Sequence, residues 1–246
     1  MYSAKAITPI PVYLISGFLG SGKTTLLNYL LQQWPKSAVI INEFGSTPID
    51  QQLLRNHNVP LSTLAGGCLC CQVIGALTPL LKNLRLAWEQ NPNAFARVII
   101  ETSGVANPEP VLDIILRERW LAKRYSLQAV LTTVSASNGL TQLQRFPAAQ
   151  AQIAWADILL QTQTDLASDS SLAQLQAQLQ SLNPTAKRLI APHGRIAVHD
   201  LQLAKLSFRA IPPNNPDTTA HNFSTSSLQL AQPIDIARVQ GHHLRR

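Results

Sequence analysis

Short apolar runs alternate with longer amphipathic segments along most of the chain. The runs have the length of buried parallel strands, and the segments between them carry apolar residues at helical spacing. Strands that alternate with helices in this way predict an α/β fold with a doubly wound, mostly parallel sheet. The runs lie at Val12–Ile15, Ala38–Ile41, Val98–Ile100, Val130–Val134, Ile158–Leu160 and Arg188–Ile190.

The amphipathic segment from Ser170 to Leu182 illustrates the predicted helices. Its leucines at positions 172, 175, 179 and 182 fall on one helical face, and Asn183-Pro184 ends the segment. We interpret this stripe as part of the core and not as a binding motif.

The pattern changes after about Leu206. Residues 211–217 read Ile-Pro-Pro-Asn-Asn-Pro-Asp, which is typical of a linker, and about thirty residues follow. A strand-like stretch at 224–230 and a basic end are too short to form an independent domain. We therefore expect one α/β domain at residues 1–205, followed at 206–246 by a linker and a short, truncated C-terminal extension.

A glycine-rich loop follows the first apolar run and precedes a helical segment. Residues 17–24 read Gly-Phe-Leu-Gly-Ser-Gly-Lys-Thr, a phosphate-binding loop or Walker A motif. In such a loop backbone N–H groups surround an anion, Lys23 can reach the β- and γ-phosphates, and the Thr24 hydroxyl can ligate Mg²⁺. This predicts a nucleoside-triphosphate site on a fold of the P-loop NTPase type. The candidate nucleotide-binding residues of the loop are Gly17, Gly20, Ser21, Gly22, Lys23, Thr24 and Thr25.

A carboxylate and a small-residue turn follow the third apolar run. Glu101 comes directly after the run, and Thr-Ser then leads to Gly104. Glu101 could hold the hydration shell of Mg²⁺, and at Gly104 a backbone N–H could approach the γ-phosphate. The alternative is an ordinary strand-end glutamate in a turn. Lys23, Thr24 and Glu101 are therefore the candidate catalytic residues, and Thr24 and Glu101 the candidate Mg²⁺ ligands.

All three cysteines of the chain lie within four residues. Cys68, Cys70 and Cys71 follow two glycines, and Glu43 lies two residues after the second apolar run. Three thiolates suit Zn²⁺ or Co²⁺ and leave a fourth position for water, Glu43 or a ligand from a recipient protein. The alternatives are a redox pair or buried cysteines that bind nothing.

Composition narrows the class of protein. The chain has 246 residues, 46% of them hydrophobic and 13% charged, with a net charge of +7. Its basic residues are scattered, so we expect no nucleic-acid partner. We also expect no membrane segment and no secretory signal, and the clustered thiols suit a reducing compartment, so we expect a cytoplasmic protein.

Four motifs in this order resemble the CobW-type P-loop GTPases, metallochaperones related to the nickel-inserting and urease-accessory GTPases. The resemblance runs from about residue 10 to residue 200. The motifs are the loop at 17–25, Asn-Glu-Phe-Gly at 42–45, Gly-Cys-Leu-Cys-Cys at 67–71, and Glu-Thr-Ser-Gly at 101–104 followed by Asn107-Pro108; Gln152–Asp157 resembles the family's lead into its guanine-recognition strand.

The resemblance implies a GTPase able to dimerise, in which GTP binding and slow hydrolysis are coupled to delivery of a divalent metal to a client protein. The thiols of the Cys-x-Cys-Cys motif would hold the metal, Lys23 would contact phosphates, and Thr24 and Glu101 would serve Mg²⁺. Asp165 aligns with the aspartate that reads guanine, to which its carboxylate would accept two hydrogen bonds.

The chain departs from the family at its guanine motif. The family's Asn-Lys-x-Asp is Thr162-Gln163-Thr164-Asp165 here, so Thr162 offers only a hydroxyl and Gln163 lacks a charged stem. We expect weaker nucleotide binding with some guanine preference. The family also has acidic residues where this chain has Ser46, Thr63 and Ser135.

Two other functions remain as alternatives, and the departures favour the first of them. One is a catalytically weak metal-binding protein, regulatory or for storage, with a vestigial nucleotide site. The other is a small-molecule kinase on a P-loop fold, which leaves the cysteine cluster unexplained.

Overall fold

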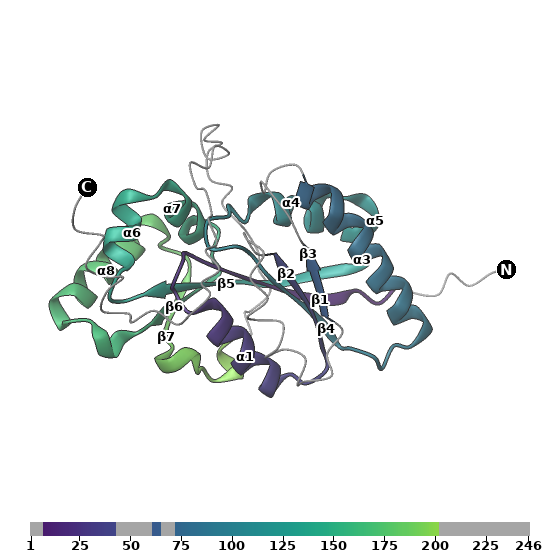
Figure 1. Ribbon diagram of the computed structural model, residues 1–246, viewed down its shortest axis with the longest axis horizontal. Coiled ribbons are helices and arrows are strands. Elements are labelled where there is room, and N and C mark those ends of the chain that lie inside the picture. Colours follow the sequence, from purple (N-terminus) through teal and green to yellow (C-terminus); the bar gives the residue numbers. More distant parts are fainter. Residues whose placement is uncertain (1–6, 43–60, 65–71, 202–246) are drawn as a thin grey trace, which may run out of the picture.

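The computed structural model describes residues 7–42, 61–64 and 72–201. Within these residues seven strands form one sheet in the order β3-β2-β4-β1-β5-β6-β7, and each of its six pairings is parallel (Figure 1). The predicted α/β, doubly wound sheet is confirmed. The strands are β1 (Ile10–Gly17), β2 (Ser37–Asn42), β3 (Leu61–Leu64), β4 (Arg97–Glu101), β5 (Tyr125–Ser135), β6 (Ile158–Thr162) and β7 (Lys187–Ile190).

Helices cover both faces of the sheet (Figure 1). Val98 and Ile100 of β4 pack in one apolar cluster with α3, α4 and α5, whereas Ile99 packs in another with α1. This alternation places successive side chains on opposite faces, both of them buried, as a parallel sheet requires. The helices are α1 (Lys23–Gln33), α3 (Gln72–Gln90), α4 (Glu109–Arg117), α5 (Arg119–Ala122), α6 (Gly139–Arg145), α7 (Pro147–Ala154) and α8 (Asp169–Leu182), with short 3₁₀ turns η1 (Thr164–Leu166), η2 (Pro192–Gly194) and η3 (Val198–Leu201).

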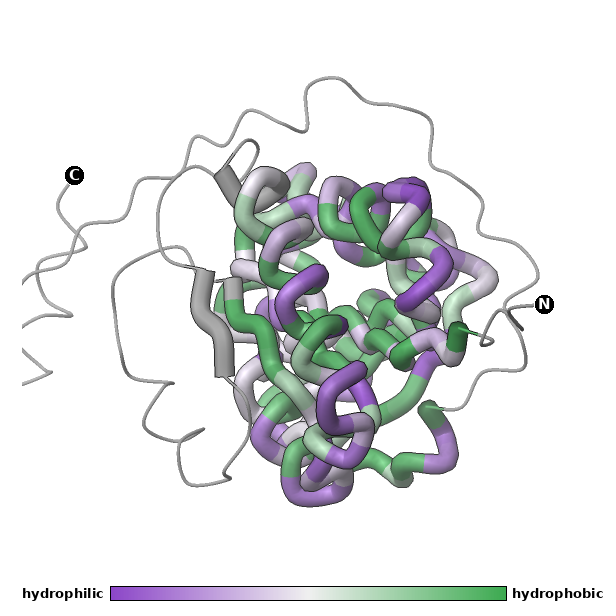
Figure 2. Tube along the Cα trace, turned by 90° about the vertical axis from the view of Figure 1, so that its right-hand side faces the viewer, coloured by the Kyte–Doolittle hydropathy of each residue, from purple (hydrophilic) through white to green (hydrophobic). Residues whose placement is uncertain are grey.

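The apolar segments gather in the interior and the hydrophilic ones along the outer turns (Figure 2). A third apolar cluster joins α6, α7 and α8 to β5 and β6. Leu175 and Leu179 are fully buried in it, and Leu172 and Leu182 pack against it. The leucine stripe of this helix is therefore core, as predicted. Ser168 begins the helix by accepting a hydrogen bond from the N–H of Ser171.

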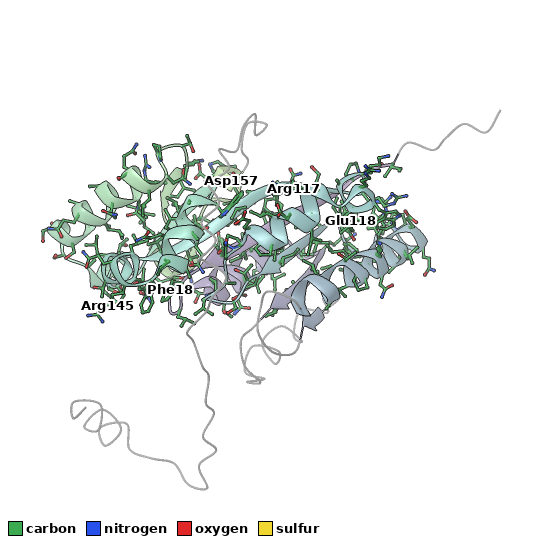
Figure 3. The ribbon with its side chains drawn as sticks, turned by 90° about the horizontal axis from the view of Figure 1, so that it is seen from above. Phe18, Arg117, Glu118, Arg145 and Asp157 are labelled. Atoms are coloured by element: carbon green, nitrogen blue, oxygen red, sulfur yellow. The ribbon has the colours of Figure 1, made fainter. Side chains whose placement is uncertain are left out.

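Because all the described strands are parallel, their carboxyl ends lie along one edge of the sheet and their amino ends along the opposite edge. Phe18 follows β1 at the carboxyl edge, whereas Asp157 precedes β6 and Arg117 ends α4 at the opposite edge; the two groups lie on opposite sides in Figure 3. In open α/β sheets ligands bind at the carboxyl edge, outside the strand ends.

The predicted linker at 211–217 and strand-like stretch at 224–230 lie outside the described residues. None of the helices described is both long enough and apolar enough to span a bilayer.

Candidate nucleotide-binding site

The glycine-rich loop lies between the end of β1 and the start of α1, at the centre of the sheet's carboxyl edge. Gly17, Gly20 and Gly22 all have positive φ, at 137°, 71° and 93°. Glycine adopts these angles without steric cost. No side chain caps the N-terminus of α1, which begins at Lys23. The N–H groups of its first turn are therefore placed to bind an anion.

Thr24 and Glu101 meet beside the loop. Thr24 Oγ1 donates to Glu101 Oε1 at 3.1 Å, although the two residues are 77 positions apart. The contact follows from the sheet, because β1 and β4 are neighbours and Ile15 pairs with Glu101. Glu101 is only 6% exposed. A hydroxyl and a buried carboxylate in contact form an oxygen pair that suits Mg²⁺.

Lys23 reaches back over the loop. Its Nζ donates to the carbonyl of Phe18 at 3.3 Å, so the ammonium lies close to the loop backbone. Ser21 is fully buried and its Oγ lies 2.7 Å from Thr133 Oγ1 on β5. Lys23 is thus bonded to the start of the loop, and Ser21 joins the loop to β5. Thr25, the last of the candidate residues in this region, is exposed on α1.

Side chains from other elements hold three successive carbonyls of the loop. Gln142 Nε2 on α6 donates to Leu19 O at 3.1 Å, and Gln163 Nε2 donates to Gly20 O at 3.3 Å. Thr162 Oγ1 donates to Ser21 O at 2.8 Å. These bonds orient the loop through its carbonyl oxygens. Sequence reasoning considered Thr162 and Gln163 only as neighbours of the base and missed Gln142.

Two of the departures from the family pattern contact each other. Ser135 Oγ donates to Gln163 Oε1 at 2.6 Å, and Gln163 has the positive φ of 53°. A neutral hydroxyl–amide pair therefore occupies this position beside the loop. Asp165 lies two residues further on, exposed in η1.

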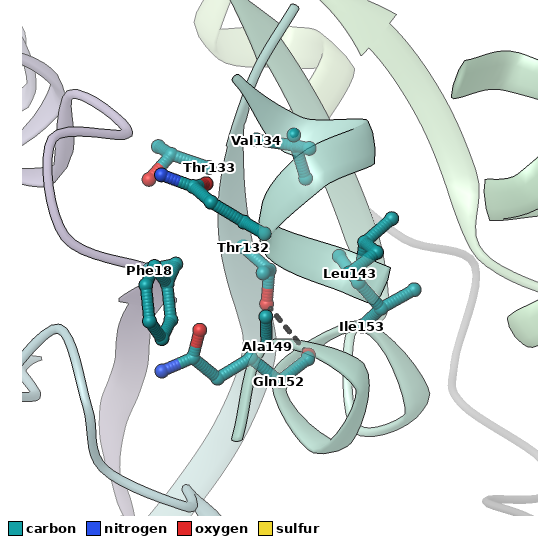
Figure 4. A pocket seen from close by; sticks show the side chains of 10 residues that line it. Phe18, Thr132, Thr133, Val134, Leu143, Ala149, Gln152 and Ile153 are labelled. Atoms are coloured by element: carbon teal, nitrogen blue, oxygen red, sulfur yellow. Dashed lines mark hydrogen bonds between the residues drawn. The ribbon is translucent and has the colours of Figure 1, made fainter. Parts of the chain in front are cut away.

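The turn after Glu101 packs directly on the loop. A Cβ added at Gly104 would lie 2.9 Å from Leu19 N and 3.0 Å from Leu19 Cα, so only glycine allows this approach. Next to it, a small hollow of about 10 Å³ lies between Phe18 and the helices α6 and α7 (Figure 4). Gln152 lines this hollow, and sequence reasoning gave its side chain no role.

The candidate metal ligands Cys68, Cys70, Cys71 and Glu43 lie outside the described residues, as does Ser46, and the side chain of Thr63 is not described. Among the residues that are described, no group of three His, Cys, Asp or Glu side chains could hold a metal ion. Asn42 and Leu64 are the last described residues before the two gaps, and they pair with each other at the ends of β2 and β3. Both ends lie at the carboxyl edge.

A family profile and two curated proteins all relate this chain to the same family of nucleotide-binding proteins. The sequence profile of the CobW/HypB/UreG nucleotide-binding domain matches residues 11–189. Zinc chaperone YjiA of Escherichia coli is 34% identical over 249 residues, covering 95% of this chain and 76% of YjiA. Zinc chaperone YeiR of the same organism is 30% identical over 234 residues, covering 89% of this chain and 66% of YeiR.

The crystal structure of the Zn(II)-bound YjiA GTPase has a TM-score of 0.60 and 27% identity over 79% of this chain and 61% of that chain. This chain therefore spans about two thirds to three quarters of the length of these curated relatives. The profile match extends from the second residue of β1 almost to the end of β7, so it includes every described strand of the sheet. The chain belongs to the CobW/HypB/UreG family.

Proposed function

We propose that the protein is a GTP-dependent metal chaperone: it binds GTP with Mg²⁺, hydrolyses it slowly, and uses this cycle to bind Zn²⁺ or Co²⁺ and deliver it to a client protein. The observation that carries the proposal is the contact between Thr24 and Glu101 at the edge where β2 and β3 end. Ile41 pairs with Glu101, so β2 ends next to the proposed Mg²⁺ ligand.

In this proposal the residues of the site contact different parts of GTP. Backbone N–H groups from Gly17 to Thr25 would surround the phosphates, and the Lys23 ammonium would neutralise charge on them. Thr24 and Glu101 would hold Mg²⁺, which would neutralise negative charge on the phosphates. Gly104 would contact the γ-phosphate, and Asp165 would read guanine.

The metal part of the proposal uses Cys68, Cys70 and Cys71, with Glu43 as a further ligand. It is supported by the relatives YjiA and YeiR, both named zinc chaperones, and by the Zn(II)-bound form of YjiA. Thiolates persist in a reducing compartment, so the proposal places the protein in the cytoplasm. It also assigns the GTPase domain to residues 1–205, a linker and C-terminal extension to 206–246, and the capacity to form a homodimer.

Removing the carboxylate of Glu101 is expected to weaken GTP binding only when Mg²⁺ is present. The E101Q variant should lose about tenfold in affinity with Mg²⁺, because a neutral amide is a poor ligand for the ion. Titration of GTP with Mg²⁺ and with a chelator separates the two conditions. E109Q is the matched control, because Glu109 starts α4 and contacts Asn107 instead of the loop. Equal losses with and without Mg²⁺ would show that Glu101 serves only the fold.

GTP is expected to change the metal affinity of the protein. In a Co²⁺ titration of the reduced protein, the thiolate-to-cobalt charge-transfer band should appear at an at least fivefold different metal concentration when GTP–Mg²⁺ is present, in the range usual for coupled sites. Linkage requires Co²⁺ to shift the GTP affinity by the same factor. The band should be lost in C70A.

Identical Co²⁺ titrations with and without GTP–Mg²⁺ would contradict coupling. They would favour the metal-binding protein with a vestigial nucleotide site, a function that the neutral contact between Ser135 and Gln163 also suits. Intact metal binding without GTP hydrolysis above background would point the same way. Absence of any band would contradict both functions and direct attention to cysteine redox chemistry.

A further inference from the structure

A single buried amide joins α7 to the turn that follows β4. Gln152 is 1% exposed, and its Nε2 donates to Gly104 O at 3.2 Å and to Ala106 O at 2.9 Å. Carbonyl oxygens only accept hydrogen bonds, so the NH₂ end of the amide must face the turn. Both protons of this NH₂ group are therefore donated to carbonyls of the segment 104–106.

The two halves of the turn are held by different elements. Thr102 is tied to β1, because its N–H and its Oγ1 both donate to Ile15 O, at 2.9 and 3.3 Å. The second half, from Gly104 to Ala106, is tied to α7 through Gln152. Gln152 thus fixes the part of the turn that packs on Leu19 of the phosphate-binding loop.

The helix that carries Gln152, α7, is itself held in place by hydrogen bonds. Thr132 Oγ1 on β5 donates to Gln152 O at 3.2 Å, the bond drawn in Figure 4. Asn183, which follows α8, donates to the carbonyls of Ile153 and Ala156 at 2.8 and 2.9 Å. The end of α7 is therefore bonded both to the sheet and to α8. Movement of the turn would have to break the Gln152 bonds or displace this helix.

The Oε1 end of the amide makes no hydrogen bond to the described residues. Gln152 Oε1 is buried and has no hydrogen-bond partner among the described residues, although Gln152 lines the hollow next to Phe18. An unpaired buried acceptor lowers stability, and an apolar side chain of similar shape avoids this cost. Packing alone therefore does not account for a glutamine at position 152. The two hydrogen bonds from its NH₂ group to the turn do account for it.

We propose that Gln152 is a positioning residue that holds Gly104 where its backbone N–H can meet the terminal phosphate of a nucleoside triphosphate. Within the described residues the Gly104 N–H makes no hydrogen bond. The inference rests on the proposed nucleotide function and adds to it the residue that positions Gly104, whose N–H would distinguish a triphosphate from a diphosphate. A diphosphate lacks the group that Gly104 would contact, so Gln152 should matter little for its binding.

The test compares Q152M with Q150M. Met keeps the length of the side chain and removes its NH₂ group. Gln150 is the matched control, because it lies on the same helix and its Nε2 donates to a backbone carbonyl, that of Leu143, at 2.7 Å. The affinities of both variants for GDP and for a non-hydrolysable GTP analogue are measured with Mg²⁺, and thermal unfolding is followed in parallel.

Q152M is expected to lose about tenfold in affinity for the analogue and less than twofold for GDP, the effect of one hydrogen bond to a charged phosphate. Q150M should bind both like wild type. Equal losses for GDP and analogue, or no loss, would overturn the role of Gln152. Wild-type protein that binds neither nucleotide would instead overturn the proposed function itself.

A second measurement needs no variant. Hydrogen exchange of the wild-type protein should show that the analogue, unlike GDP, protects the amides of both the turn at 102–106 and α7. Protection of the turn without any difference in α7 would show that the two elements are not joined through Gln152, whatever the stability of Q152M.

Discussion

Replacement of Lys23 by alanine is expected to weaken GTP binding by about two orders of magnitude while leaving the fold intact. The Nζ group lies 3.3 Å from Phe18 O, at the backbone of the glycine-rich loop, where it can neutralise phosphate charge. Hydrogen bonds from an ammonium to phosphate are charge-assisted, and two of them account for an effect of this size. Calorimetric titration with GTP and with GDP measures the loss.

The fold should tolerate the change, because Lys23 is half-buried at the start of α1 and alanine favours a helix. K36A is the control for the loss of one positive charge: Lys36 is exposed beyond the end of α1. It should bind GTP within twofold of wild type. If K23A and K36A lose affinity equally, general electrostatic attraction and not the loop lysine holds the nucleotide.

The strands were predictable from sequence because a doubly covered parallel sheet requires continuous apolar runs. Each of the six predicted runs falls inside an observed strand. β3, Leu61–Leu64, was missed because it reads Leu-Ser-Thr-Leu, too short and too polar to stand out. It is an edge strand that pairs only with β2 in the described sheet, so the demand for apolar residues is weaker there.

The contact between Thr24 and Glu101 follows from motif and topology together, because parallel strands bring their carboxyl ends to one edge. The bonds from Gln142 to Leu19 O and from Gln152 to Gly104 O could not be predicted in this way. Each joins residues far apart in the chain through a flexible side chain, and a glutamine on a helix has no local pattern that reveals its partner. Ser135 and Gln163 were noted separately as departures, and only the fold shows that they form a pair.

Replacement of Gly17 by alanine is expected to lower the free energy of unfolding by about 3–5 kcal/mol. Gly17 has a φ of 137°, which L-residues with a side chain rarely adopt. A Cβ at this position would lie 2.5 Å from Thr133 O and 2.7 Å from Ser21 Oγ. Gly17 pairs with Thr133 in the sheet, so the backbone oxygen cannot rotate away and β1 and β5 would have to separate.

Urea and thermal unfolding, followed by far-UV circular dichroism, measure the loss, which should lower the melting temperature by about 10 °C. G75A is the matched control: Gly75 lies in α3, and a Cβ there meets nothing within 4 Å. That variant should gain about 0.5–1 kcal/mol, because alanine favours a helix over glycine. If G17A unfolds like wild type, the loop can move away from β5, and its shape would then depend on the bonds from Gln142, Thr162 and Gln163 more than on the packing of Gly17 against the sheet.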